Sequence, residues 1–211
     1  METILGDLHW RYAVKKFDST KRLTEEQLNT LLEVIRLAPT AYGLQPIQAI
    51  VVQSPELREQ LLPHSFGQRQ VIDASHLIVL CAQKSFDSSD IDDHIRRTEN
   101  IRQFEKNALN NYSDFLKRTI LGQDEKSIVE WNSKQAYLVI GMLLHACAQL
   151  KIDATPMEGF DPEGYARIIG LDENKLQPVL LLPVGYRHEE DATQHLKKVR
   201  KEPAEIIRFL N

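Results

Sequence analysis

Two groups of cationic side chains, near opposite ends of the chain, are the first candidates for chemistry. Arg11 and Lys15 lie four positions apart, a spacing that would place both on one face of a helix. Four more cations cluster near the other end, at Lys197, Lys198, Arg200 and Lys201. Either group alone is more typical of a solvated surface. Together they are suited to hold a phosphate, because Arg offers a planar fork of donors and Lys a point charge.

Two short segments have the composition of backbone that contacts a ligand. Thr155-Pro-Met-Glu-Gly159 is an extended stretch closed by a glycine, although a simple turn that ends a strand explains it equally well. The loop from Thr40 to Gln45 places small and polar groups between a helix end and a strand. Such loops commonly supply ligand contacts.

The signatures of several enzyme classes are missing. The sequence contains no GxGxxG, GxxxxGK[ST], GxSxG or HExxH motif, which argues against the common dinucleotide, nucleotide, hydrolase and zinc-protease sites. Asp73-Ala-Ser-His76 holds the residue types of a serine-hydrolase triad, but neighbouring residues cannot converge as a triad requires. The seven histidines show no metal-ligand spacing, so we expect no metal site.

Length and composition predict an ordinary globular protein. The 211 residues suit one domain, residues 1–211, that can bury a core without disulfides. A net charge of −4 argues against a nucleic-acid binder. We expect neither a signal peptide nor a membrane span, because the longest uncharged apolar run, Gln135 to Leu150, is too short. Cys81 and Cys147 are distant and in apolar surroundings, which predicts free thiols in the cytoplasm.

Helices and strands are expected without regular alternation, which indicates an α+β fold. Thr24 and Gln27 form a capping-box signal for a helix that ends at Ala38-Pro39. A second helix is expected from Pro55, and polar helices from about residue 87 to 121. The segment from Trp131 to Leu150 is apolar nearly all round, which predicts a helix that is deeply buried or lies at a subunit interface.

The expected strands are few. Strands are predicted at Ala49–Gln53, His76–Ala82 and Gln177–Gly185, with a short extended segment from Asp153 to Glu158. The run His76–Ala82 is apolar on both faces, as expected for a central strand. Glu205 to Leu210 is predicted as a last strand that has no neighbour to complete a hairpin. The edge of a partner subunit's sheet would supply one.

Several segments resemble those of the nitroreductase / NAD(P)H:flavin oxidoreductase family, in its oxygen-insensitive bacterial branch. They occur in family order along almost the whole chain: Arg11-Tyr-Ala-Val-Lys-Lys-Phe-Asp18, Ala38-Pro-Thr-Ala-Tyr-Gly-Leu-Gln-Pro46, Gly67-Gln-Arg-Gln70, Asp73-Ala-Ser-His76, Trp131-Asn-Ser-Lys-Gln-Ala-Tyr137, Asp153-Ala-Thr-Pro-Met-Glu-Gly-Phe160, Pro183-Val-Gly-Tyr186 and Lys198-Val-Arg200. The likeness is weakest between about residues 87 and 130.

The resemblance implies a fold and an assembly. The fold is a three-layer α+β sandwich, in which helices flank a central, mostly antiparallel sheet. The assembly is a homodimer with a large interface, FMN at that interface and a C-terminal strand exchanged with the partner. It implies an FMN-dependent enzyme that uses NADH or NADPH and passes electrons to small-molecule acceptors.

The resemblance also implies a role for individual residues. The FMN phosphate is assigned to Arg11, Lys198 and Arg200, and the ribityl chain to Tyr12 and Ala13. Lys15 is expected near flavin N1 and O2, and the backbone of Glu158 and Gly159 near N5 or O4, which makes Lys15 and Glu158 the catalytic positions. The remaining cofactor contacts are Pro39, Thr40, Ala41 and Gly43 from the partner subunit, with Gln70, Pro156 and Met157.

Hydride transfer explains why no catalytic triad is needed. The implied mechanism is ping-pong, in which NAD(P)H reduces the flavin, leaves, and is replaced by a nitroaromatic, a quinone or a free flavin. A Lys15 ammonium would stabilise the negative charge of the reduced flavin. A specialised branch, such as a reductive dehalogenase or a flavin-cleaving enzyme, and a non-catalytic flavin-binding dimer remain as alternatives.

Some positions depart from the family pattern. Gly67 has no side chain, and Gln70 brings no charge, where better-known members carry an Asn and a Lys. Ala41 replaces a common hydroxyl, so its backbone N–H is the expected donor. Tyr112 and Phe115 fall in the variable helical segment, where an aromatic gate and ordinary helix packing both fit.

Overall fold

The computed structural model describes residues 4–210 and has a four-stranded antiparallel sheet at its centre. The strands are β1 (Ile47–Val52), β2 (His76–Gln83), β3 (Asp153–Ala154) and β4 (Leu176–Gly185), in the order β1-β2-β4-β3. The expected α+β class is confirmed, and the three strands expected from apolar runs lie within a few residues of their predicted bounds. The predicted extended segment at 153–158 pairs as a strand over only its first two residues.

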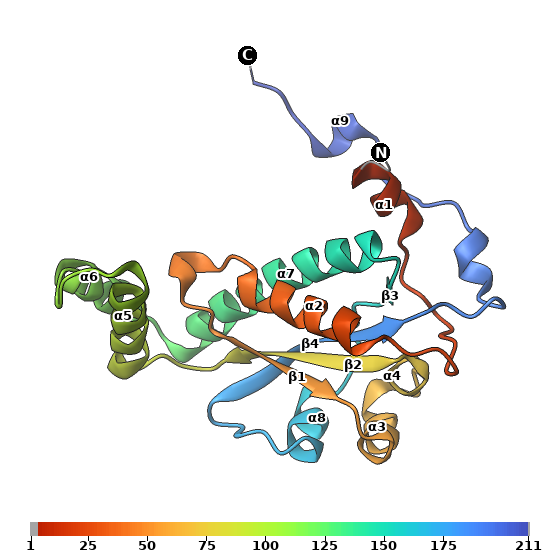
Figure 1. The fold of residues 1–211 in the computed structure, drawn as a ribbon, viewed down its shortest axis with the longest axis horizontal. Coiled ribbons are helices and arrows are strands. Elements are labelled where there is room, and N and C mark those ends of the chain that lie inside the picture. Colours follow the sequence, from red (N-terminus) through yellow and green to blue (C-terminus); the bar gives the residue numbers. More distant parts are fainter. Residues whose placement is uncertain (1–3, 211) are drawn as a thin grey trace.

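Helices cover both faces of this sheet, which gives three layers (Figure 1). One face carries α2 (Glu25–Leu37) and α7 (Glu125–Gln149), and the other carries α3 (Pro55–Leu61), α4 (Gln70–Asp73) and α8 (Pro162–Ile168). Alternate residues of β2 belong to two separate hydrophobic cores, one on each face of the sheet. Ile78 and Leu80 pack towards α2 and α7, whereas Leu77 and Val79 pack towards α3 and α8. The prediction of a central strand that is buried on both faces is therefore confirmed.

The long helix α7 begins earlier than predicted. Asp124 caps it, because its side chain accepts a hydrogen bond from Ser127 N. One face packs on the sheet through residues such as Val139 and Leu143, which are fully buried. Apolar side chains on the opposite face remain exposed, namely Tyr137, Leu138 and Met142. The helix therefore has more apolar surface than this single chain covers.

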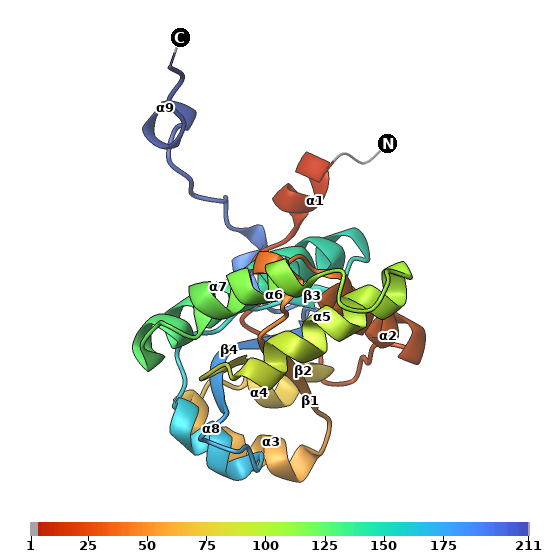
Figure 2. The same cartoon turned by 90° about the vertical axis from the view of Figure 1, so that its left-hand side faces the viewer.

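Two further helices stand apart from the sheet. The helices α5 (Ser88–Arg102) and α6 (Asn110–Ile120) pack on each other and on the start of α7 (Figure 2). Their own small core is formed by Ile91, Ile95, Leu116, Ile120 and Ile128. The predicted polar helical region is confirmed, and its scarcity of apolar residues explains why only this satellite cluster anchors it.

The chain ends project from the body of the molecule. The helix α1 (Ile4–Trp10) and the C-terminal arm, which we define as residues 196–210, extend away from the sheet (Figures 1 and 2). The predicted strand at 205–210 is wrong for the chain by itself. The short helix α9 (Pro203–Ile206) begins there instead, because Pro203 occupies its first turn and Glu202 and Glu205 form a capping box. The residues after it pair with no strand among those described.

The capping box at the start of α2 offers a test of the fold. Thr24 Oγ1 accepts from Gln27 N at 3.1 Å, and Gln27 Oε1 accepts from Thr24 N at 3.0 Å. We expect Thr24→Ala to lower the free energy of unfolding by about 1 kcal/mol in urea denaturation. Thr30→Ala, within the same helix, is the control and should be neutral or slightly stabilising, because Ala is the better helix former. Equal effects of the two substitutions would contradict the assigned cap.

Candidate functional site

The segment from Arg11 to Lys16 belongs to neither a helix nor a strand, and it bends at Lys15 and Lys16. Because α1 ends at Trp10, the predicted placement of Arg11 and Lys15 on one helical face is wrong. A neighbouring segment holds this stretch, since Thr155 Oγ1 donates to Val14 O at 2.7 Å. Because the stretch has no regular structure of its own, contacts of this kind fix its course.

The carboxylate of Asp191 holds the same segment from the other side. It accepts hydrogen bonds from Lys15 N at 2.8 Å, Lys16 N at 3.1 Å and the Tyr12 hydroxyl at 3.1 Å. Its other oxygen accepts from Thr193 N, and the side chain is 3% exposed. Burial alone would raise the pKa of Asp191, but these donors outweigh it and the pKa lies below its ordinary value. Sequence reasoning missed Asp191, although an Asp two residues before a Thr is a recognisable capping pattern.

Cations from the two ends of the chain meet next to this segment. Lys198 Nζ donates to Arg11 O, and Arg200 is close enough to lower the pKa of both Arg11 and Lys198. Burial lowers both pKa values further and is the larger cause. Within residues 4–210, no carboxylate forms an ion pair with any of the three. Three converging cations without an acidic partner form a site suited to a multiply charged anion.

Two backbone donors are available in the segment from Thr155 to Gly159. Met157 is fixed to β4, because its N–H donates to Leu181 O at 2.9 Å and its carbonyl accepts from Leu181 N at 3.0 Å. Pro156 has no N–H. The N–H groups of Glu158 and Gly159 are exposed and donate to no group in the described part of the chain.

Gln70 adds a polar side chain on α4. It is 7% exposed, yet its amide takes part in no hydrogen bond among residues 4–210. The amide atoms are not fully buried, because the only fully buried side-chain N or O atom without a partner among residues 4–210 is Asn132 Oδ1. The Gln70 amide is therefore available to hydrogen-bond a polar ligand. Gly67, three residues earlier, has a left-handed backbone with a φ of 72°, and a Cβ there would meet nothing within 4 Å.

The loop from Pro39 to Gly43 does not meet these residues within one chain. It follows the C-terminal end of α2, whereas the segment from Arg11 to Lys15 precedes the other end of that helix (Figure 1). The Ala41 N–H, which is the expected ligand donor of this loop, already has a partner within the chain. That group donates to Gln135 Oε1 on α7 at 2.8 Å.

The two aromatic residues considered as a gate lie beside that loop. The rings of Tyr112 and Phe115 stack at 6.3 Å, and Phe115 meets Tyr42 edge to face at 6.1 Å. Tyr42 and Phe115 are each 42% exposed, so they form a rim that remains open to solvent. Tyr112 is partly buried against the satellite core, which assigns it to helix packing.

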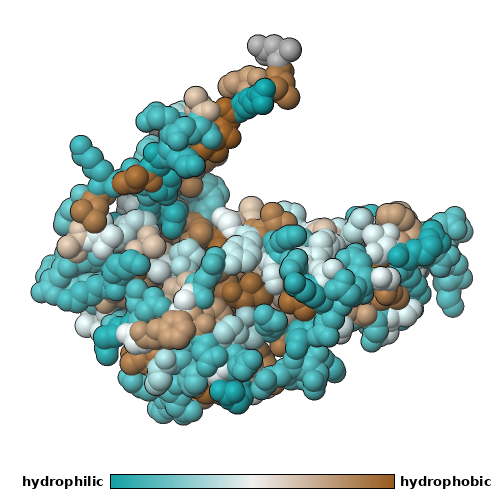
Figure 3. Space-filling view, turned by 180° about the vertical axis from the view of Figure 1, so that it is seen from behind, coloured by the Kyte–Doolittle hydropathy of each residue, from teal (hydrophilic) through white to brown (hydrophobic). Residues whose placement is uncertain are grey.

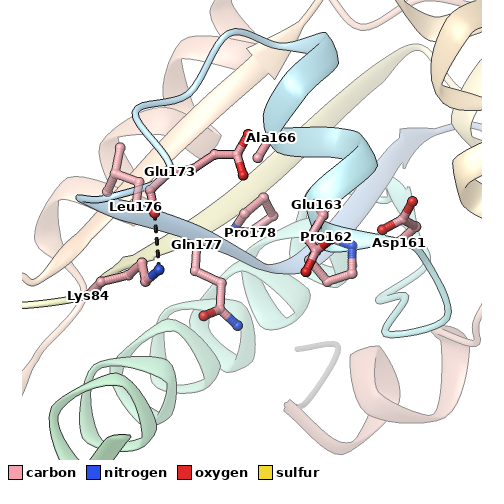
Figure 4. A pocket seen from close by; sticks show the side chains of 9 residues that line it. All are labelled: Lys84, Asp161, Pro162, Glu163, Ala166, Glu173, Leu176, Gln177 and Pro178. Carbon is pink, nitrogen blue, oxygen red and sulfur yellow. Dashed lines mark hydrogen bonds between the residues drawn. The ribbon is translucent and has the colours of Figure 1, made fainter. Parts of the chain in front are cut away.

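Other candidates do not form sites. Asp73 pairs with Arg69 at 2.8 Å, and Ser75 Oγ accepts from Leu23 N, so Asp73, Ser75 and His76 form no triad. No metal-ligating group of His, Cys, Asp and Glu occurs among residues 4–210, and none of the helices described is long and apolar enough to cross a membrane. A pocket of about 330 Å³ beside α8 contains none of the residues discussed above (Figure 4). Its lining is of mixed charge, and Lys84 Nζ there donates to Glu173 O.

Comparisons with known proteins agree on one family. The family model described as "Nitroreductase family" matches residues 8–186. A protein of Staphylococcus epidermidis provisionally named as an NAD(P)H nitroreductase is 33% identical, over 99% of this chain and 97% of its own length. A nitroreductase structure from Bacillus subtilis has a TM-score of 0.87 at 21% identity and covers 98% of both chains. A nitroreductase from Exiguobacterium sibiricum, solved in complex with FMN, has a TM-score of 0.83 at 20% identity, over 99% of this chain and 97% of that one.

The Asp191 carboxylate gives a prediction with a defined pH dependence. Asp191→Asn should lower the free energy of unfolding at pH 7 by about 2–3 kcal/mol, because an amide group cannot accept from all these donors. The folded-state pKa lies below the unfolded value of about 3.9, so the stabilisation is complete above that pH. It is lost as the pH falls through the folded-state pKa, and the two proteins should then converge in stability.

An exposed aspartate supplies the control. Asp114→Asn on α6 removes the same charge from the surface and should change the stability by less than about 0.5 kcal/mol. A loss for Asp191→Asn that is no larger than this at pH 7 would show that the carboxylate does not hold the segment.

Proposed function

Because the chain belongs to the nitroreductase family, we propose that it is an FMN-dependent oxidoreductase that uses NADH or NADPH to reduce nitroaromatics, quinones or free flavins. The observation that carries the proposal is the meeting of Arg11, Lys198 and Arg200 without a carboxylate partner among the described residues. A phosphate monoester, which is largely dianionic at neutral pH, would relieve the repulsion between these cations. FMN carries one such phosphate at the end of its ribityl chain.

The residues near the cations fit the rest of that molecule. Tyr12 and Ala13 directly follow Arg11 in the chain, next to the cations, and would line the ribityl chain. At the ring end, the amide of Gln70 and the N–H groups of Glu158 and Gly159 have no hydrogen-bond partner among the described residues. These groups can bind the polar edges of a flavin. Pro156 and Met157 provide the backbone beneath the ring, with Met157 fixed by β4.

When bound, FMN would supply the capacity to accept a hydride and to release it. Lys15 would then act through charge, because its exposed ammonium has no ion-pair partner within residues 4–210. Such an ammonium stabilises negative charge that develops during reduction. Glu158 would act through its backbone N–H, as a donor that orients the reacting edge. No side chain has to serve as a nucleophile, which is consistent with a ping-pong exchange of donor and acceptor.

The site requires a second copy of the chain. Pro39, Thr40, Ala41 and Gly43 lie beyond the far end of α2, so we propose that the partner subunit contributes them. The surface supports a homodimer, since apolar side chains are exposed on α7 and on the C-terminal arm, at Tyr137, Leu138, Met142, Leu196, Val199, Ile207, Phe209 and Leu210. Figure 3 shows hydrophobic surface between the body and the projecting arm. Exposed apolar area of this extent is typical of a protein interface.

An anaerobic assay tests the reaction. The purified protein should be yellow, bleach within seconds on addition of NADH or NADPH, and recover its colour on addition of a quinone or a nitroaromatic. Bleaching without recovery by any acceptor in a panel would favour a specialised branch of the family. A coloured protein that neither nucleotide bleaches would point to a non-catalytic flavin-binding dimer, and a protein that binds no FMN would refute the proposal.

A substitution in the arm tests the phosphate site. Arg200→Ala should weaken FMN binding, measured by fluorescence titration, by about tenfold or more, because a charge-assisted contact is lost. Arg208→Ala removes the same charge from the same arm at an exposed position and is the matched control. If both variants retain the affinity of the parent protein, Arg200 does not hold the phosphate.

A further inference from the structure

The backbone from Met157 to Asp161 leaves only two of its donors free. Both polar groups of Met157 bond to Leu181. Glu158 O accepts from Phe160 N at 3.0 Å, and Asp161 N donates to His64 O at 2.7 Å. Among the described residues, the N–H groups of Glu158 and Gly159 are therefore the two donors of this stretch that remain available to a ligand. The direction of the Glu158 N–H is set by the bond from Leu181 N to Met157 O, which fixes the peptide plane that holds it. The Gly159 N–H lies in the next plane, and the bond from Phe160 N to Glu158 O couples that plane to the one that carries Gly159 O. A contact that fixes Gly159 O therefore helps to fix the direction of the Gly159 N–H.

Gln68 completes this bonding from another part of the chain. Its Nε2 donates to Gly159 O at 2.8 Å and to Ser65 O at 3.1 Å. Two carbonyl acceptors define the orientation of the amide, because an amide oxygen in the same place would face both of them without a hydrogen. The contact is also close in space, since a Cβ on Gly159 would lie 3.4 Å from Gln68 Nε2.

We propose that Gln68 is a positioning residue, which holds the carbonyl of Gly159 so that the N–H group of Gly159 stays directed at the reacting edge of the flavin. The inference rests on the proposed function, because it gives that donor a flavin to meet. Gln68 is not itself one of the cofactor contacts assigned above, but it bonds to one of them, Gly159. Its effect on the reaction passes through Gly159 alone.

The loop that carries Gln68 is itself rigidly held against the same region. Ser65 Oγ bonds to the buried Tyr165 hydroxyl at 2.6 Å, and His64 Nδ1 lies 2.8 Å from Asp161 Oδ2. The chain then turns through two left-handed residues, Phe66 with a φ of 52° and Gly67 with a φ of 72°. This turn brings Gln68 back towards Gly159. A rigid support is what the precise aiming of backbone donors requires.

The substitution Gln68→Glu tests the role, because it keeps the shape of the side chain and removes both donors at neutral pH. At pH 8 we expect bleaching of the FMN-loaded protein by NADH to slow on the order of tenfold to a hundredfold. The midpoint potential of the bound flavin should fall and its visible spectrum should shift, while the FMN dissociation constant stays within about threefold of the parent value. At pH 5 a carboxyl group beside two carbonyl oxygens regains a proton and can donate again, so these properties should return towards those of the parent.

The control is Gln60→Glu, which adds the same charge at an exposed position on α3. Parent-like potential and spectrum in Gln68→Glu at pH 8, a change no larger than that of the control, or a slow rate explained entirely by lost FMN would each overturn the role of Gln68. The behaviour of the unsubstituted protein distinguishes failure of the positioning role from failure of the proposed function. If the parent does not bind FMN or is not bleached, the proposed function fails, whereas a normal parent with an unaffected Gln68→Glu refutes only the positioning role.

Discussion

The hydrogen bonds to the buried Asp191 carboxylate are the interaction on which the candidate site depends. The segment from Arg11 to Lys16 belongs to neither a helix nor a strand, so regular structure does not fix its course. Asp191, which is distant in sequence, supplies a charged acceptor for two of its backbone donors and for Tyr12. Charge-assisted bonds in a buried place are strong and directional. They bring the N-terminal segment to the region that leads into the arm with Lys198 and Arg200.

This arrangement explains why three cations can be held together without an acidic partner among the described residues. Repulsion between Arg11, Lys198 and Arg200 would separate them if the chain were free to move. Lys198 instead donates to the carbonyl of Arg11, so one cation is bound to the backbone of another. Holding the three cations together costs electrostatic free energy, and a bound anion would offset that cost. Burial, and to a lesser degree this repulsion, lowers the pKa of Arg11 and of Lys198.

Elements governed by local patterns were predictable from the sequence. The capping box at Thr24, the alternating burial of β2 and the satellite helices each follow from residues close to one another in the chain. Prediction failed where distant residues decide the outcome. Spacing alone placed Arg11 and Lys15 on a helix, but that stretch is not helical, and contacts with Asp191 and Thr155 hold it. Ala41 N–H was expected to be free, but Gln135, 94 positions away, accepts from it.

The C-terminal arm is a further case in which residues outside the local sequence decide the structure. Its apolar residues predicted a strand, because such residues need a partner to cover them. Among the described residues the arm pairs with no strand, and the local preference of Pro203 and Glu205 for a helix prevails. Val199 and Phe209 are more than four-fifths exposed, so the arm has not reached the environment that its composition requires. On the exposed face of α7, the apolar side chains of Leu138 and Met142 are also left uncovered by the single chain. In the proposed homodimer, a second copy of the chain would cover both surfaces and would bring its loop at Thr40 to the proposed FMN site.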